Sequence, residues 1–222
     1  MQDLLLFSQV SPARHKQVLQ ILVGITAAQP APFLEQHLVF EQLRLPPVSK
    51  KAPANQTTRR AYQHLTRQPL ESNSWTLRKP EVPEPGVKQV ITQSVSEVSL
   101  PEADLEKFRP GLEWYKFINQ FYLQGHRFVQ GNVVITISRV CPAETTDGDL
   151  LESEAPTTVN LPPLDPSGSY VIEACVRMED GSTTALRDQA TKELLAFADG
   201  LKGAIDLRVP DRLALDPRIK GA

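Results

Sequence analysis

The sequence predicts an α+β domain made mainly of β-strands and carrying two Pro-rich loop insertions. Runs rich in β-branched and aromatic residues recur along most of the 222 residues, whereas only two long stretches have helical periodicity. Twelve of the 19 prolines fall in residues 46–85 and 142–168, seven in the first and five in the second. A chain of this length buries enough surface to fold without disulfides or metals, and we expect residues 1–222 to form a single domain.

The N-terminal part predicts a strand, a helix and a second strand. Leu4–Phe7 is a short apolar run typical of a buried strand. A helix is expected over residues 12–27, because Pro12 suits the first helical position and apolar residues recur after it at helical spacing. Prolines at 30 and 32 are expected to end this helix, and the β-rich run 38–45 predicts the second strand.

Residues 46–85 differ from the rest in composition. The overlapping stretch 44–79 holds eight Lys or Arg and a single acid, Glu71. A Pro-rich, charged stretch buries too little apolar surface to offset its ordering entropy. We therefore predict a basic, partly disordered insertion over 46–85, interrupted by one strand at Trp75–Arg78.

The middle of the chain predicts a strand, a short helix and a long hairpin. Residues 87–98 suit a half-exposed strand, and Ser99 with Glu102 has the spacing of a capping box that starts a helix ending near residue 110. Residues 112–124 fit both a helical stripe and one face of a strand; their aromatic density favours the strand. Because Gly131-Asn132 is typical of a hairpin turn, we expect an antiparallel hairpin over about 115–141.

The C-terminal third begins with an acidic loop. Residues 143–165 hold six acids and no Lys or Arg, and the Pro-rich stretch 142–168 is too long for an ordinary loop, so we predict a surface insertion or a disordered loop. A strand is expected over 170–178, and the apolar spacing from Leu186 to Leu201 predicts a long helix. A short closing segment should follow over 213–218.

Residue types that support catalysis or metal binding do not form recognisable motifs. The chain has no Gly-rich phosphate loop, no nucleophile elbow and no paired-histidine zinc motif. No two of its histidines, at positions 15, 37, 64 and 126, have metal-ligand spacing on a shared element. Cys141 and Cys175 lie in apolar runs, so we predict buried free thiols in a reducing compartment. On the predicted strand, Glu173, Cys175 and Arg177 share one face, which fits either a barrel lumen or a solvated side. We predict no catalytic residue, no cofactor and no metal.

Two other classes of protein remain as alternatives. A barrel-type metal-dependent phosphohydrolase needs carboxylates two apart on a strand, but the one E-x-E, Glu152–Glu154, lies in the acidic loop. A stand-alone RNA-binding barrel could use the basic stretch 44–79, which fits a solvated linker better because it is diffuse. The net charge of −2 argues against a dedicated nucleic-acid binder, and no stretch approaches the roughly 18 apolar residues of a membrane span.

Five stretches, taken together in their order and spacing, resemble the family of subunit 18 of the Mediator complex of RNA polymerase II transcription. They are Leu4–Ser8 with the helix to Ile25; Phe33–Phe40; Gln124–Phe128 with Gly131 and Val133–Val140; Tyr170–Met178 with the long helix; and Leu213–Arg218. The resemblance covers most of the chain outside the Pro-rich loops, whose composition suggests a fungal member.

The resemblance implies a single closed antiparallel β-barrel flanked by helices, and it would resolve residues 112–124 as strand. It implies a nuclear, non-enzymatic scaffold that pairs with Mediator subunit 20 and is tethered to the head module by the C-terminal helix of subunit 8. Contacts with other head-module subunits and RNA polymerase II are implied too. The family's barrel is similar to that of metal-dependent RNA triphosphatases, but this sequence lacks their strand-borne glutamate pairs.

The aromatic-rich start of the predicted hairpin is our candidate for partner binding. We expect it to supply part of the core and to leave an exposed remainder on a partner surface. The residues are Trp114, Tyr115, Phe117, Phe121 and Tyr122. No membrane contact and no sequence-specific nucleic-acid contact is expected.

Overall fold

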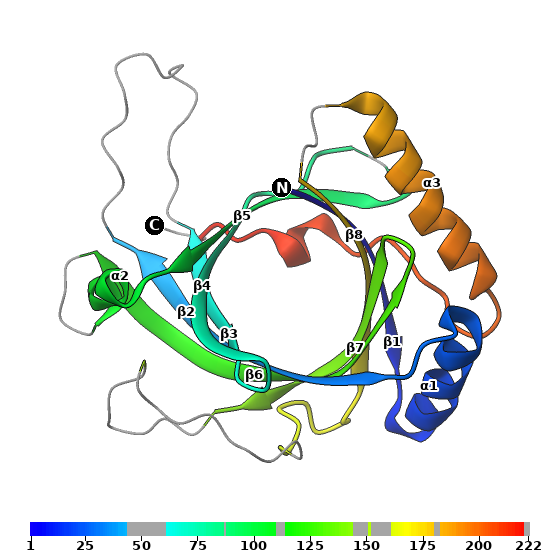
Figure 1. Ribbon diagram of the computed structural model, residues 1–222, viewed down its shortest axis with the longest axis horizontal. Helices are drawn as coiled ribbons and strands as arrows, with labels where there is room; N and C mark the ends of the chain where they lie inside the picture. Colours follow the sequence, from blue (N-terminus) through cyan, green and yellow to red (C-terminus); the bar gives the residue numbers. More distant parts are fainter. Residues whose placement is uncertain are drawn as a thin grey trace.

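A computed structural model describes residues 1–43, 61–86, 88–109, 114–143, 151, 161–179 and 183–219. Within these ranges, eight antiparallel strands form a closed barrel in the order β1-β5-β4-β3-β2-β6-β7-β8 (Figure 1). The strands are β1 (Gln2–Val10), β2 (Ala31–Gln42), β3 (Tyr62–Gln68), β4 (Ser72–Pro80), β5 (Ile91–Leu100), β6 (Tyr115–Gln130), β7 (Val133–Pro142) and β8 (Tyr170–Met178). The helices are α1 (Pro12–Thr26), α2 (Glu102–Leu105) and α3 (Thr184–Gly200), with 3-10 turns η1 (Glu106–Phe108) and η2 (Arg212–Leu215). The closed barrel flanked by helices confirms the predicted fold class.

The first three elements follow the prediction except at the start of β2. Helix α1 begins at Pro12 and ends at Thr26, and the next residue, Ala27, has a left-handed φ of 52°. Pro32 does not lie between elements, as expected, but inside β2, where it pairs with His126 of β6. Pairing with β3 begins only at Gln36, so no neighbour on that side needs the amide hydrogen that Pro32 lacks.

The stretch predicted as a basic insertion contains two strands of the barrel wall. Residues 62–80 form the β3–β4 hairpin, so this part of 46–85 is not an insertion, and β3 was missed. Its sequence has polar residues on both faces and therefore lacks the apolar alternation that marks a half-buried strand. Residues 46–60 lie outside the described ranges, and for them the insertion stays a prediction.

The predicted capping box is wrong. Ser99 pairs with Thr76 inside β5, and the residue that precedes α2 is Pro101. Ser99 does not cap a helix because the β4–β5 ladder continues to Leu100, and strand pairing fixes its backbone. Strand β5 also begins at Ile91, four residues later than expected.

The C-terminal half follows the prediction closely. Strands β6 and β7 form the expected hairpin, with Gly131 at a φ of 59° in the turn, and both β8 and α3 lie where they were predicted. Of the Pro-rich stretch 142–168, residues 142, 143, 151 and 161–168 are described, and the Leu164 amide donates to the Val140 carbonyl at 2.8 Å. This end of the loop is therefore held against the barrel wall.

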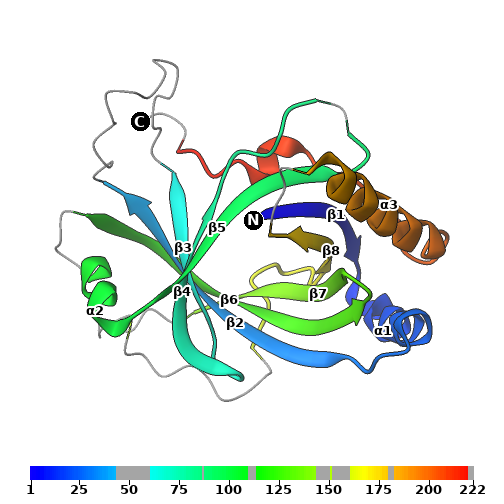
Figure 2. The same ribbon diagram turned by 45° about the horizontal axis from the view of Figure 1, so that its top comes forward.

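The largest hydrophobic core lies outside the barrel, between its wall and two helices. Figures 1 and 2 show α1 and α3 packed beside β1, β7 and β8. Outward-facing Leu4 and Ile135 join Leu22 of α1 and Leu194 of α3 in one buried cluster. Because side chains alternate along a strand, the neighbours of these residues point into the lumen. Since the main apolar core lies outside the barrel, the lumen can hold polar side chains. In the part of the chain that the structure describes, no helix is long and apolar enough to cross a membrane.

Candidate protein-interaction surface

The start of β6 takes part in an aromatic cluster on the outer face of the barrel. Tyr115 stacks on Phe108 with ring centroids 4.2 Å apart, and Phe40 of β2 lies edge-on to Phe108 at 5.1 Å and to Phe117 at 5.7 Å. We call Phe40, Phe108, Tyr115 and Phe117 the aromatic cluster. The turn η1 delivers Phe108 to it, and Phe108 and Phe40 are almost fully buried. The cluster is a rigid support for any side chain beside it.

Trp114 lies next to this cluster with half of its surface exposed. Its side chain is 50 % exposed and that of Ile118 is 39 % exposed. The carbonyl of Trp114 accepts a hydrogen bond from the Leu43 amide at 2.9 Å, which holds the backbone against the end of β2. An exposed indole on a fixed backbone is typical of a binding anchor.

Phe121 and Tyr122 are not part of this exposed surface. Phe121 faces the lumen and stacks on His37 at 4.7 Å. Tyr122 is on the outer face but is only 5 % exposed, packed with Leu34 and Cys141, and burial raises the pKa of its phenol. The structure therefore places three of the five predicted residues together at the start of β6 and the other two in separate interior environments.

The lumen carries a network of charges that joins four strands. Asp3 of β1 is fully buried and accepts two hydrogen bonds from Arg177 of β8, at 2.8 and 2.9 Å. Arg78 of β4 approaches Asp3 at 3.3 Å, and Glu97 of β5 pairs with Arg177 at 2.9 Å and with Arg78 at 3.5 Å. Hydrogen bonding to Asp3 raises the pKa of Arg177 further above its usual range. Both arginines are thus offset by carboxylates.

The face shared by Glu173, Cys175 and Arg177 is the lumen, which decides between the two alternatives left open by the sequence. Burial raises the pKa of both Glu173 and Cys175. Because the thiolate is the nucleophilic form, a thiol with a raised pKa is poorly suited to catalysis. Cys141 is buried on the outer side, and burial raises its pKa too.

The structure assembles two pairs of histidines that sequence spacing did not reveal. His15 of α1 stacks on Tyr170 at 3.9 Å and lies 5.7 Å from His126 of β6, measured between ring centroids. In the lumen, Nδ1 of His37 lies 3.4 Å from Nδ1 of His64. Sequence spacing could not predict either pair, because the members of each are on different elements. His37 and His64 meet through the register of β2 and β3, and His15 meets His126 where α1 packs on the barrel wall. Among the described residues, no group of three or more His, Cys, Asp or Glu is placed to hold a metal ion.

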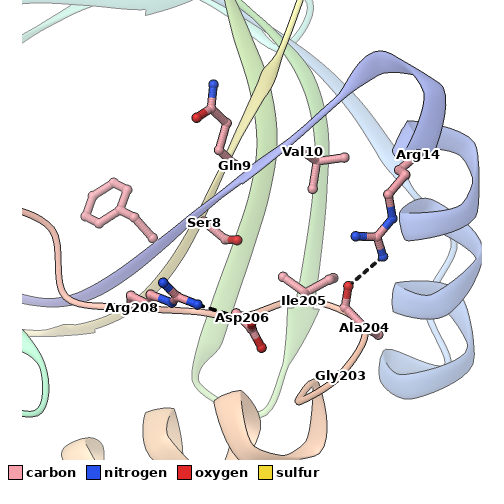
Figure 3. A pocket seen from close by; sticks show the side chains of 10 residues that line it. Ser8, Gln9, Val10, Arg14, Gly203, Ala204, Ile205, Asp206 and Arg208 are labelled. Carbon is pink, nitrogen blue, oxygen red and sulfur yellow. Dashed lines mark hydrogen bonds and ion pairs between the residues drawn. The ribbon is translucent and has the colours of Figure 1, made fainter.

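A polar groove of about 380 Å³ lies where β1, α1 and the segment after α3 meet (Figure 3). The guanidinium of Arg14 donates to the carbonyl of Ala204 at 2.8 Å, and Arg208 pairs with Asp206 at 3.3 Å. Among the described residues that line the groove there is no thiol, imidazole or carboxylate pair. The Arg14–Ala204 bond ties the chain after α3 to α1, and backbone bonds between Phe7 and Arg208 tie it to β1. It is best described as a joint between elements.

Comparisons with known proteins place this chain in a family. The family model for the Med18 protein matches residues 2–218. The Mediator of RNA polymerase II transcription subunit 18 of Aspergillus oryzae is 27 % identical over 275 residues, covering 99 % of this chain and all of that protein. The subunit 18 of Neosartorya fischeri is 29 % identical over 273 residues with the same coverage. Both relatives are fungal.

Solved structures share the fold at low identity. A chain of the Schizosaccharomyces pombe Mediator head module superposes with a TM-score of 0.72 at 16 % identity, covering 95 % of this chain and 99 % of that one. HpAC1 of Hippeastrum, a putative adenylyl cyclase with a dominant triphosphatase activity, has a TM-score of 0.52 at 10 % identity and covers 95 % of this chain and 91 % of its own. These similarities concern the barrel architecture. Since the family model matches the chain almost from end to end, the chain belongs to the Med18 protein family.

Proposed function

We propose that this chain is a non-enzymatic subunit of the Mediator complex, located in the head module and acting in the nucleus. The observation that carries the proposal is the family match over residues 2–218. Its curated relatives are Mediator subunits, and its barrel superposes on a chain of a Mediator head module. The chain would act as a scaffold through which regulatory signals reach RNA polymerase II.

The proposed partners are Mediator subunit 20, as a heterodimer, and the C-terminal helix of Mediator subunit 8. Exposed Trp114 beside the aromatic cluster offers an anchor of the kind that dominates binding energy at protein interfaces. A closed barrel has few free sheet edges, so partners are expected to use exposed faces such as this one.

Co-expression tests the partner assignment. The full chain is co-expressed with subunit 20 and the C-terminal region of subunit 8 from the same species, and the mixture is run on a size-exclusion column. We expect a single complex that contains all three chains. Elution of this chain alone, with both partners folded, would contradict the proposal.

A matched pair of variants tests the surface. Trp114→Ala removes the exposed anchor at the start of β6, and we expect at least a tenfold weaker association, about 1.4 kcal/mol. Val129→Ala is the control, because Val129 is 51 % exposed on the same strand but near its other end. Equal affinities for the two variants, measured by calorimetry, would remove Trp114 from the interface.

No observation favours the phosphohydrolase alternative. A phosphate-binding lumen needs cations that are free to meet the substrate, but Arg78 and Arg177 are both paired with Asp3 and Glu97. The RNA-binding alternative relies on the stretch 44–79, of which residues 62–79 belong to the barrel wall.

A further inference from the structure

The first turn of α1 is attached to the barrel wall by a histidine instead of an aliphatic side chain. His15 lies three residues before Val18 and seven before Leu22, so it begins the buried stripe of the helix, and it is the one residue of the first turn that is not exposed. Its ring stacks on Tyr170 of β8 at 3.9 Å with 9° between the ring planes, and it lies 5.7 Å from the ring of His126 of β6. The contact between α1 and the wall therefore depends on titratable groups at this end.

An arginine of β7 adds a third basic group to this contact. Arg139 is a diagonal neighbour of His126 on the outer face of the β6–β7 ladder. Its guanidinium carbon lies 5.5 Å from the centre of the Tyr170 ring, and one of its nitrogens donates to the Leu161 carbonyl at 3.1 Å. We call this set of side chains the α1 seam: His15, His126, Arg139 and Tyr170.

Each histidine of the seam has one buried ring nitrogen without a hydrogen-bond partner among the described residues. These nitrogens are Nε2 of His15 and Nδ1 of His126. A neutral imidazole can present a lone pair at such a nitrogen, whereas an imidazolium carries an N–H on both nitrogens. Protonation of the closed seam would therefore leave one buried N–H donor unsatisfied in each ring, and opening would give both donors to water.

The charges around the seam also oppose protonation. Burial lowers the pKa of both rings, and the positive charges of His126 and Arg139 lower the pKa of His15 further. Helix α1 contains no Asp or Glu, and its first turn has the positive end of the helix dipole. The other charged groups of the elements that meet here have different surroundings: Lys16 is exposed, Arg14 donates to the Ala204 carbonyl, Arg127 pairs with Glu71, Asp165 accepts from Ser167, Arg208 pairs with Asp206, and Glu173 and Arg177 face the lumen.

We propose that the His15–His126 pair makes the docking of α1 acid-sensitive. When both rings take up a proton, the first turn of α1 leaves the barrel wall, while Leu22 stays in the core and the barrel stays closed. Because opening takes up two protons, the ratio of open to closed seams rises by up to about a hundredfold per pH unit, against about tenfold for a single proton. The fold thus contains a conformational device that responds to pH below the ordinary range of histidine titration.

Amide hydrogen exchange of the full native chain tests this inference, with rates corrected for the intrinsic effect of pH. The amides of residues 16–19 bond to carbonyls of the first turn, and a single turn that has left the wall frays. We expect their protection to fall at least tenfold between pH 7.5 and pH 5.5, with a slope steeper than tenfold per pH unit near pH 5.5. Protection in the β6–β7 hairpin should not change.

His15→Phe is the matched variant, because it keeps an aromatic ring on Tyr170 but takes up no proton. Its slope should be tenfold per pH unit or less, whereas His64→Gln, which removes a histidine from the lumen, should leave the slope of the wild type unchanged. Imidazole NMR titration of the wild type needs no variant, and His15 and His126 should both titrate at lower pH than a free histidine. Full protection of residues 16–19 down to pH 5.5, the same slope in His15→Phe and wild type, or an equal loss of protection in the β6–β7 hairpin would overturn the proposal.

Discussion

Gly125 shows how a single hydrogen atom sets the distance between two strands. A Cβ at this position of β6 would lie 1.9 Å from the carbonyl oxygen of Ile137 and 2.8 Å from Cα of Ser138, both in the backbone of β7. No rotamer change can relieve a contact with backbone atoms. The pairing of β6 with β7 therefore depends on glycine here, just before the His126 that packs under α1.

Gly125→Ala is expected to destabilise the fold by about 3 kcal/mol or more, because the two strands must separate to accept the methyl group. Urea unfolding followed by circular dichroism measures the change. Gly24→Ala in α1 is the control: nothing lies within 4 Å of its added Cβ, and alanine should stabilise the helix by about 0.5–1 kcal/mol. Similar stability of Gly125→Ala and wild type would contradict the close approach.

His64 should make stability depend on pH. The pKa of His64 is lowered from 6.5 to about 4 by burial and by the nearby His37 and Arg78. Between these two pH values His64 is protonated in the unfolded chain but neutral in the folded chain. The folded state therefore keeps its full stability above pH 6.5 and loses stability as the pH falls towards 4. Between pH 8 and pH 5 this amounts to about 2 kcal/mol.

The comparison of wild type with His64→Gln, by urea unfolding, isolates this effect. We expect the variant to lose about 2 kcal/mol less than wild type between pH 8 and pH 5. Identical pH profiles for the two proteins would show that His64 titrates normally in the folded chain.

Each outer helix is held by one narrow apolar stripe. In α3, Ala190, Leu194 and Phe197 are buried against the wall formed by β1, β7 and β8, whereas Leu186, which the sequence places on the same stripe, is 50 % exposed. The first turn of α3 therefore extends beyond the part of the barrel that it covers. The same periodicity that predicted the helix could not show where its contact with the wall begins.

Leu194→Ala should lower the free energy of unfolding by about 2–5 kcal/mol, because the side chain is fully buried in the main core. Leu186→Ala removes the same atoms from an exposed position of the same helix and should change stability by about 0.5 kcal/mol or less. Chemical denaturation of both variants measures the two changes in the free energy of unfolding. Equal losses would mean that α3 does not pack as described.

At the scale of the whole molecule, the C-terminal segment joins parts of the barrel that are far apart in sequence. We call residues 206–218 the C-terminal strap; Figures 1 and 2 show it running from the end of α3 past β1 towards β3. Phe7 and Arg208 exchange two backbone hydrogen bonds of 2.8 Å, Arg212 donates to the Pro83 carbonyl at 2.8 Å, and the Tyr62 amide donates to Pro217 at 2.9 Å. The strap pairs with β1 beyond Leu5, where the β5 ladder has ended.

Deletion of residues 206–222 should expose the amides that the strap protects. Ile205, which belongs to the core, is retained. Amide hydrogen exchange at Phe7 and Tyr62 is expected to become much faster, while β1 amides bonded to β8 stay protected. Unchanged exchange at both positions would show that the strap does not hold these strands.

Local sequence patterns predicted the elements that depend on residues close together in the chain. The β6–β7 hairpin follows from its turn and its flanking apolar residues, and α1 follows from Pro12 and its stripe. The candidate surface was predicted in part, since Trp114 is exposed as expected and Phe121 and Tyr122 contribute to the interior. The strand β3 was missed because polar residues occupy both of its faces, so its sequence lacks the apolar alternation of a half-buried strand.

Periodicity and turn signals along the chain predicted most strand and helix positions, and the order and spacing of five stretches predicted the family. The single closed barrel with flanking helices was implied by the family resemblance. The faces of the strands that meet inside the barrel are set by strand pairing in the folded chain. Closure of eight strands brings Asp3, Arg78, Glu97 and Arg177 from four strands into one network, and it places His37 beside His64. The physical reason is register: which side chains become neighbours is set by how the strands pair, and a shift of one residue would turn every one of them to the other face.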